Sequence, residues 1–180
     1  LKHYAEWTPT TIEYGDTTLL DFYDNNLAIN SDKPAIYFFG RTQTYGELDK
    51  HVRHAAAGLR ALGVRAGDRV AILLPNCPPH LAAFYAVLKL GATVVEHNPL
   101  YTAHALEHPF NDHGARVAIC WDTAAPTLEK LRGPTPLETI VSVNMTEAVP
   151  LLQKIALRMP LRSLPNTRAQ PTADATNPIP

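Results

Sequence analysis

Hydrophobic residues along this chain alternate between helical spacing and short continuous runs. The clearest helical stretch begins at Thr44 and Glu47, which form a capping-box pattern, and it ends at Gly63. Its apolar positions form one stripe, namely Leu48, Val52, Ala55, Ala56, Leu59 and Leu62. A weaker stretch of the same kind begins at Thr18, with Asp21 in the capping position. Both patterns predict amphipathic helices whose N-termini are capped by their own side chains.

Short apolar runs predict the strands. They cover residues 35–39, 70–74, 92–96, 117–121 and 139–143. The run 70–74 is apolar at every position, which is typical of a strand buried on both faces of a parallel sheet. Helices are expected between the runs, over residues 79–90 and 102–114 and more weakly over 123–131. This order predicts an α/β fold, with a layered, mainly parallel sheet and helices on both faces.

The character of the sequence changes after Pro150. Residues 1–150 are interpreted as one α/β domain. Residues 151–158 form a short basic amphipathic segment, and residues 160–180 are rich in proline and poor in large apolar residues. The basic segment suits a membrane surface, but packing on the protein itself is the commoner use of such a helix. We expect residues 151–180 to be a flexible linker, cut before a following domain.

The composition of the chain argues against two classes of protein, those that bind nucleic acids and those that span a membrane. The net charge is −1 and no basic block occurs, which argues against a nucleic-acid partner. The longest apolar stretch, residues 81–95, is interrupted by Lys89 and Gly91 and is too short to span a membrane. Cys77 and Cys120 both lie beside apolar sequence, and there is no CxxC motif. We expect a cytoplasmic protein with reduced, buried thiols.

Candidate ligand-binding residues follow the strand predicted at 92–96. His97, Asn98 and Tyr101 come directly after it, and open α/β sheets bind ligands beyond the carboxyl ends of their strands. A simpler interpretation is a loop in which Asn98 shapes a turn before Pro99. The sequence favours the turn and leaves the binding role as the alternative.

A second motif points to a different chemistry. His104, Glu107 and His108 match HxxEH, in which two histidines on one helix face bind zinc and the glutamate acts as a base. Pro109 follows directly and is expected to disturb the helix that such ligands need. No clear third ligand is placed by the sequence. A zinc hydrolase of the HxxEH type is therefore the less favoured alternative, and no metal-binding residue is assigned.

Residues 44–119 resemble the adenylate-forming superfamily, and within it the acyl-CoA synthetases. The resemblance rests on several motifs in the same order, which include Thr44-Tyr45-Gly46-Glu47-Leu48, Gly67-Asp68-Arg69-Val70, Leu74-Pro75-Asn76, Gly91-Ala92, His97-Asn98-Pro99-Leu100, Leu106-Glu107-His108 and Asn111-Asp112. Residues 7–39 are also similar to bacterial long-chain fatty-acid ligases. The resemblance implies that the chain is the N-terminal subdomain of the adenylate-forming fold.

The resemblance also implies a two-step reaction with ATP, Mg²⁺ and coenzyme A. A long-chain fatty acid would be joined to AMP and then transferred to the thiol of coenzyme A. The phosphate-binding loop, the adenine-binding motifs and the catalytic lysine of the superfamily are absent from these 180 residues. No catalytic or cofactor-binding residue is therefore assigned. We expect the chain to be inactive alone, with the remainder of a longer parent enzyme as its partner.

Some alternatives stay open at this stage. A fatty-acyl-AMP ligase, which passes its acyl adenylate to a carrier protein, would share these motifs. The acyl chain length and the acceptor depend largely on residues outside the chain. A homodimer and a peripheral contact with the inner face of the membrane are both compatible with the sequence.

Overall fold

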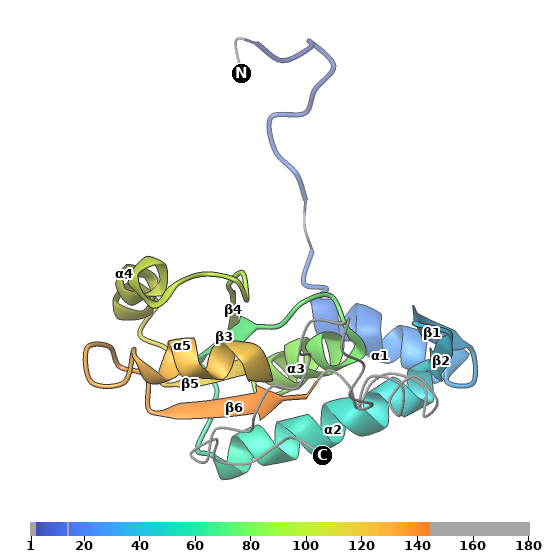
Figure 1. Cartoon of the computed structure of the whole chain (residues 1–180). Coiled ribbons are helices and arrows are strands. Elements are labelled where there is room, and N and C mark those ends of the chain that lie inside the picture. The colour runs from blue at the N-terminus through green and yellow to red at the C-terminus, as the bar shows by residue number, and fades with distance from the viewer. Residues whose placement is uncertain (1–2, 14, 145–180) are drawn as a thin grey trace.

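The computed structural model describes residues 3–13 and 15–144, and the expectations for residues 151–180 lie outside that part. Residues 3–13 project away from the folded body as an arm (Figure 1). The body begins with α1 (Leu19–Asn30), the hairpin strands β1 (Pro34–Phe38) and β2 (Arg41–Thr44), and α2 (Tyr45–Ala61). It continues with β3 (Arg69–Leu73), α3 (Pro78–Lys89), β4 (Thr93–Glu96), α4 (Ala103–His113), β5 (Val117–Trp121), a 3-10 turn (Asp122–Ala124), α5 (Ala125–Glu129) and β6 (Thr139–Val143).

A four-stranded parallel sheet forms the centre, in the order β4-β3-β5-β6. Val70 of β3 lies opposite Val94 of β4 on one side and opposite Val117 of β5 on the other. β5 pairs with β6 in the same parallel sense. The arrangement confirms the parallel sheet that the continuous apolar run at residues 70–74 predicts.

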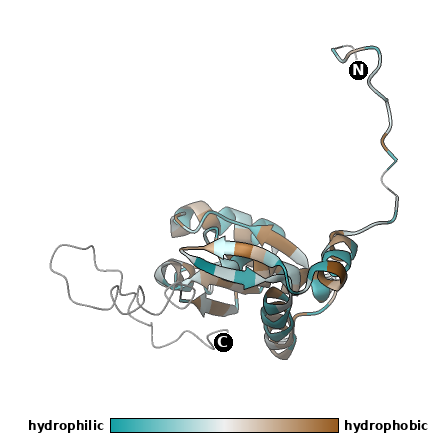
Figure 2. Ribbon diagram, turned by 90° about the vertical axis from the view of Figure 1, so that its right-hand side faces the viewer, coloured by the Kyte–Doolittle hydropathy of each residue, from teal (hydrophilic) through white to brown (hydrophobic). Residues whose placement is uncertain are grey.

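Helices cover both faces of this sheet because successive strand residues point in opposite directions. In β3, Val70 and Ile72 pack on the side of α2 and α3, whereas Ala71 and Leu73 pack on the side of α4 and α5. All four side chains are buried. Figure 2 shows hydrophobic and hydrophilic positions side by side on the helices, as expected for helices with one face on a core. The predicted fold, with helices on both faces of the sheet, is confirmed.

The β1–β2 hairpin is a separate antiparallel pair that the apolar pattern predicts only in part. The sequence indicates the first strand but no more than a turn at Gly40-Arg41. β2 is polar, and it forms because Phe39 and Gly40 both adopt positive φ (46° and 80°), as a tight hairpin turn requires. Gln43 of β2 is buried, and its Nε2 lies 2.7 Å from Nδ1 of His51 on α2, which holds the hairpin against that helix.

The helix caps agree with the sequence. Thr44 Oγ1 accepts a hydrogen bond from Glu47 N–H at 3.2 Å, and Glu47 Oε2 accepts one from Thr44 N–H at 2.9 Å. Thr18 and Asp21 form the same reciprocal pair at the start of α1. Across the described ranges, every helix is too short or too polar to serve as a membrane span.

The expectation that Pro109 disturbs its helix is wrong. α4 runs from Ala103 to His113 with Pro109 inside it. A proline at that point removes one backbone hydrogen bond, the one to the carbonyl group of Ala105. Ala105 is exposed, so water can reach that carbonyl, while Leu106 and Phe110 are fully buried on the other side of the helix. Burial of two large apolar side chains, at about 1.5–3 kcal/mol each, offsets the lost bond.

Both cysteines are buried, as the sequence predicts. Burial raises the pKa of the Cys120 thiol to about 12 and also raises that of Cys77. Both thiols are therefore protonated at neutral pH and pack as small apolar groups.

Candidate functional site

The carboxyl edge of the sheet is where the candidate residues lie. Because all four strands are parallel, they end at the same edge, and the segment His97–Tyr101 leaves the sheet there after β4. The backbone N–H of His97 still donates to the carbonyl oxygen of Ile72 at 2.9 Å. His97 is therefore held by the sheet itself, whereas the residues after it belong to the connection to α4.

His97 turns inward and contacts α4. Its Nε2 lies 3.0 Å from Nε2 of His113, and its ring stacks on Phe110 with the ring centres 5.3 Å apart. Nδ1 of His113 accepts a hydrogen bond from the backbone N–H of Ala115 at 3.0 Å. His97 and His113 are both half-buried, and they close the end of α4 against β4.

The environment of this pair disfavours charge on either ring. Burial lowers the pKa of His97, against the opposing effect of the Glu96 carboxylate. Burial and the neighbouring His97 lower the pKa of His113 to about 4. Both imidazoles are consequently neutral at pH 7, where one donates to the other.

Asn98 and Tyr101 do not join His97 in one cluster. Asn98 Oδ1 accepts a hydrogen bond from Leu100 N–H at 2.9 Å, and its carbonyl oxygen accepts one from Tyr101 N–H at 3.1 Å. These two hydrogen bonds form a turn around Pro99, which confirms the simpler interpretation of the sequence. The Tyr101 side chain is half exposed, so a role for it in binding stays a prediction.

A second histidine contact at the end of β4 is present in the structure but was not predicted from the sequence. His80, in the first turn of α3, places Nε2 2.8 Å from Oε1 of Glu96, the last residue of β4. Glu96 and His97 are consecutive strand-end residues, so the first meets α3 and the second meets α4 on the opposite face of the sheet. The sequence signal for this contact was a charged residue at the end of a strand whose other residues are uncharged, but its partner lies 16 residues away.

The HxxEH motif lies on the solvent side of α4. His104, Glu107 and His108 are all exposed. Within residues 3–13 and 15–144, no group of three or more histidine, cysteine, aspartate or glutamate side chains is placed to hold a metal ion. The motif therefore has the geometry of a hydrated helix face.

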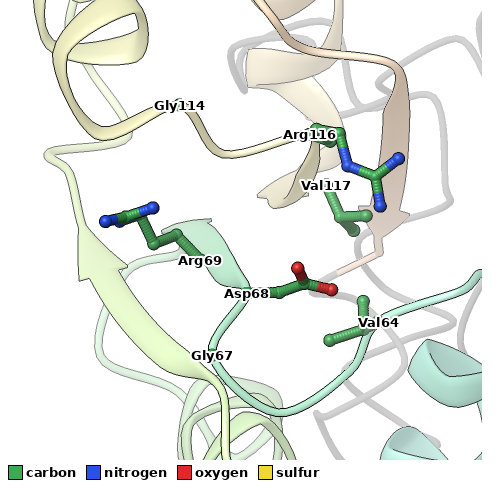
Figure 3. Close-up of a pocket in the computed structure, with 7 residues that line it drawn as sticks. All are labelled: Val64, Gly67, Asp68, Arg69, Gly114, Arg116 and Val117. Atoms are coloured by element: carbon green, nitrogen blue, oxygen red, sulfur yellow. The ribbon is translucent and has the colours of Figure 1, made fainter.

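A small pocket lies at the opposite, amino-terminal edge of the sheet (Figure 3). Its volume is about 70 Å³, and its lining consists of Val64, Gly67, Asp68, Arg69, Gly114, Arg116 and Val117. Arg116 already pairs with Glu138 at 3.3 Å, and Asp68 Oδ2 accepts a hydrogen bond from Arg65 N–H at 2.8 Å. The pocket is far smaller than the roughly 300–1,000 Å³ of small-molecule sites, so we do not assign a nucleotide to it.

Comparison with known proteins places these elements in a family. The family model described as "AMP-binding enzyme" matches residues 23–178. The long-chain-fatty-acid–CoA ligase of Escherichia coli O6:H1 is 35% identical over 147 residues, which cover 81% of this chain and 26% of that protein. The ligase of the same name from Bacillus subtilis is 32% identical over 155 residues, or 86% of this chain and 28% of that protein.

A solved structure shows the same fold. The crystal structure of an anthranilate CoA ligase in complex with anthranoyl-AMP superposes with a TM-score of 0.66 at 27% identity, and the match covers 76% of this chain and 27% of that one. In all three comparisons the chain spans little more than a quarter of the relative's length. Residues 23–178, which the family model matches, contain the parallel sheet and the candidate edge.

Proposed function

Given that this chain belongs to the family of AMP-binding enzymes, we propose that it is the amino-terminal part of a long-chain-fatty-acid–CoA ligase. The observation that carries the proposal is the 35% identity to the Escherichia coli ligase over 81% of this chain. In the proposed reaction the carboxylate of a fatty acid attacks the α-phosphorus of ATP and releases pyrophosphate. The thiol of coenzyme A then attacks the acyl carbonyl and releases AMP.

The described residues do not by themselves form a binding site for ATP, Mg²⁺ or coenzyme A. No phosphate-binding loop occurs in the sequence, and the pocket at the amino-terminal edge is too small for a nucleotide. We therefore derive no catalytic step from this chain's side chains. We propose that they build one wall of the cleft in which the longer enzyme binds its substrates.

That wall is the carboxyl edge of the sheet. Ligands of open α/β sheets bind beyond this edge. Two apolar layers hold the edge rigid, because buried side chains cover the strands on both faces. His97, Asn98 and Tyr101 lie at this edge and are the residues that we propose to border the acyl or nucleotide group.

Product analysis tests the proposed function. The 180-residue chain and the longer protein that contains it would each receive ATP, Mg²⁺, coenzyme A and a long-chain fatty acid, and acyl-CoA and acyl adenylate would be detected by mass. We expect acyl-CoA from the longer protein and no product from the 180-residue chain.

Each other result has a distinct meaning. Acyl adenylate without acyl-CoA would indicate the ligase type that feeds a carrier protein. Because the anthranilate CoA ligase shares this fold, an aromatic acid such as anthranilate is the matched second substrate. Product from the aromatic acid alone would overturn the fatty-acid assignment, and acyl-CoA from the 180-residue chain would overturn its assignment as an inactive part.

A further inference from the structure

The outer side of α2 gathers cationic side chains that are separated in the sequence. Lys50, Arg53 and Arg60 are spaced three and ten residues apart, which places them on one side of an α-helix. All three are exposed, whereas the stripe from Leu48 to Leu59 is buried on the opposite side. Arg53 forms an ion pair with the buried carboxylate of Asp49 at 2.8 Å. We call the side that carries Lys50, Arg53 and Arg60 the basic face of α2.

No acidic residue balances this face along the chain that follows. Residues 50–67 contain no aspartate or glutamate, and Arg65, just beyond the end of α2, adds a fourth exposed cation. Among the residues that the structure describes, the side chains of Lys50, Arg60 and Arg65 have no ion-pair partner. These three charges are therefore not neutralised within the described fold.

The surface between the cations is low and open. Ala57, Gly58 and Ala61 are exposed on the same side of the helix. A Cβ atom at Gly58 would meet no other element within 4 Å, so no contact of the described fold covers this part of α2. α2 lies along the side of the body that is remote from the amino-terminal arm (Figure 1). The long basic side chains are consequently the parts of this face that reach furthest into solvent.

The spacing of the charges indicates what kind of anion fits them. Lys50 and Arg60 are ten residues apart, which is about 15 Å along an α-helix, so one small anion does not reach both. Residues 50–67 include no aromatic side chain on which the bases of a single-stranded nucleic acid would stack. A membrane leaflet with anionic lipids presents many phosphate groups in one plane, and a straight helix face with low residues between its cations is complementary to it.

We propose that the basic face of α2 binds the anionic headgroups of a membrane surface, with Lys50 and Arg60 as its central contacts and Arg65 beyond them. The buried stripe stays in the core of the domain, so the helix lies on the headgroups and inserts no apolar side. Long-chain fatty acids dissolve in the same membranes, which makes the contact compatible with the proposed function. The inference rests on the charges of α2 and does not depend on ligase activity.

The expected strength follows from the number of charges. Each lysine or arginine close to an anionic leaflet strengthens binding by about fivefold. Three cations without an ion-pair partner therefore favour an anionic surface over a neutral one by about 100-fold at low ionic strength, and by less as salt screens the charges. Such a contact is peripheral and reversible.

Sedimentation with lipid vesicles tests this contact for the 180-residue chain and for the longer protein that contains it. Vesicles of phosphatidylcholine alone are compared with vesicles that also contain phosphatidylglycerol. At about 0.1 M salt we expect both proteins to bind the anionic vesicles at least about tenfold more strongly than the neutral ones. The preference should vanish at about 1 M salt, where the screening length falls to about 3 Å.

Charge reversals with a matched control make the test specific to α2. Lys50→Glu and Arg60→Glu should each weaken binding to the anionic vesicles by at least about fivefold, and the two together should reduce it to the level of the neutral vesicles. Lys130→Glu makes the same change in net charge at the exposed end of α5, which packs on the other face of the sheet. It should leave the binding nearly unchanged, because charges more than about 10 Å from the lipid are screened at the lower salt. Circular dichroism checks that all variants are folded.

Four results would overturn the proposal. Equal binding of the two kinds of vesicle would exclude a role for headgroup charge, and equal losses in Lys130→Glu and the α2 variants would exclude a defined face. Binding by the 180-residue chain but not by the longer protein would mean that the rest of that protein covers α2. Binding of polyglutamate without binding of anionic vesicles would assign the face to an acidic protein. None of these measurements involves ATP or acyl transfer, so they leave the test of the proposed function separate.

Discussion

Gly91 illustrates how a single backbone conformation joins two parts of this domain. It follows α3 with φ of 69°, in the left-handed region, and its carbonyl oxygen accepts a hydrogen bond from Gly67 N–H at 2.9 Å. A Cβ atom at this position would lie 3.1 Å from Cβ of Ala66. Glycine is thus needed both for the turn and for the close approach of the Ala66–Gly67 segment.

We predict that Gly91→Ala lowers the free energy of unfolding by about 1–3 kcal/mol, because a left-handed alanine is strained and the contact with Ala66 adds crowding. Chemical denaturation measures the loss. The matched control is Gly63→Ala, which has φ of 89° but no atom within 4 Å of the new Cβ. Equal losses in the two variants would show that Ala66 moves aside without cost.

Tyr23 shows how polar side chains specify the packing of three helices. Its hydroxyl group donates to Asp49 Oδ1 of α2 at 3.3 Å, and its ring lies 4.3 Å from that of Tyr85 on α3. Lys89 Nζ lies 5.1 Å above the ring and also pairs with Asp24 at 2.9 Å. Burial, followed by the Asp49 carboxylate, raises the pKa of the Tyr23 hydroxyl, so it remains a donor throughout the physiological range.

At the scale of elements, α2 is the helix whose local signals and tertiary packing agree most closely. The capping box at Thr44 satisfies backbone groups at its start, and the predicted stripe from Leu48 to Leu59 is buried in the apolar core that α2 shares with α3 and one face of the sheet. α1 has the same kind of cap at Thr18, but of residues 19–30 only Tyr23 is fully buried. The two helices therefore have the same kind of N-terminal cap, but α2 buries more of its side chains than α1 does.

We predict that Thr44→Ala lowers the free energy of unfolding by about 0.5–2 kcal/mol, because it leaves the Glu47 N–H without its acceptor. Thr18→Ala should cost less, since α1 can fray without exposing much of the core. Thermal or urea unfolding followed by circular dichroism compares the two. A larger loss in Thr18→Ala would mean that α1 belongs to the cooperative core and that its burial is a poor guide to its contribution.

At the scale of the whole molecule, a second apolar stripe on α1 stays uncovered. Leu19, Phe22 and Ile29 are spaced three and seven residues apart, so they share one helix face, and their side chains are 57%, 59% and 75% exposed. Trp7 of the amino-terminal arm is 85% exposed. An apolar surface of this kind is expected of a domain that packs against a further part of a longer protein.

We predict that the 180-residue chain binds an apolar fluorescent dye and that the double change Phe22→Ser and Ile29→Ser markedly reduces the signal. Leu100→Ser, a change of an exposed apolar side chain on a different element, is the control and should reduce it little. Sedimentation of the same samples would report self-association. A monodisperse unchanged chain that binds no dye would contradict the prediction of an uncovered packing surface.

The sequence by itself determined the features that depend on neighbours a few residues apart. The capping boxes at Thr44 and Thr18, the buried run at residues 70–74 and the turn at Asn98 all follow from local hydrogen bonds or local apolar patterns. The parallel sheet also follows, because a strand that is apolar at every position must be covered on both faces. The sequence motifs were likewise enough to indicate the family that the comparisons show.

Only the tertiary structure decided which distant side chains meet. His80 and Glu96 are 16 residues apart, as are His97 and His113, and each pair forms because β4 ends between α3 and α4. The polar strand β2 and the unbroken α4 were decided in the same way, by a hairpin partner in one case and by burial of Leu106 and Phe110 in the other. In each case the free energy that decides the structure comes from contacts between different elements. The pattern of residues within one element carries no information about those contacts.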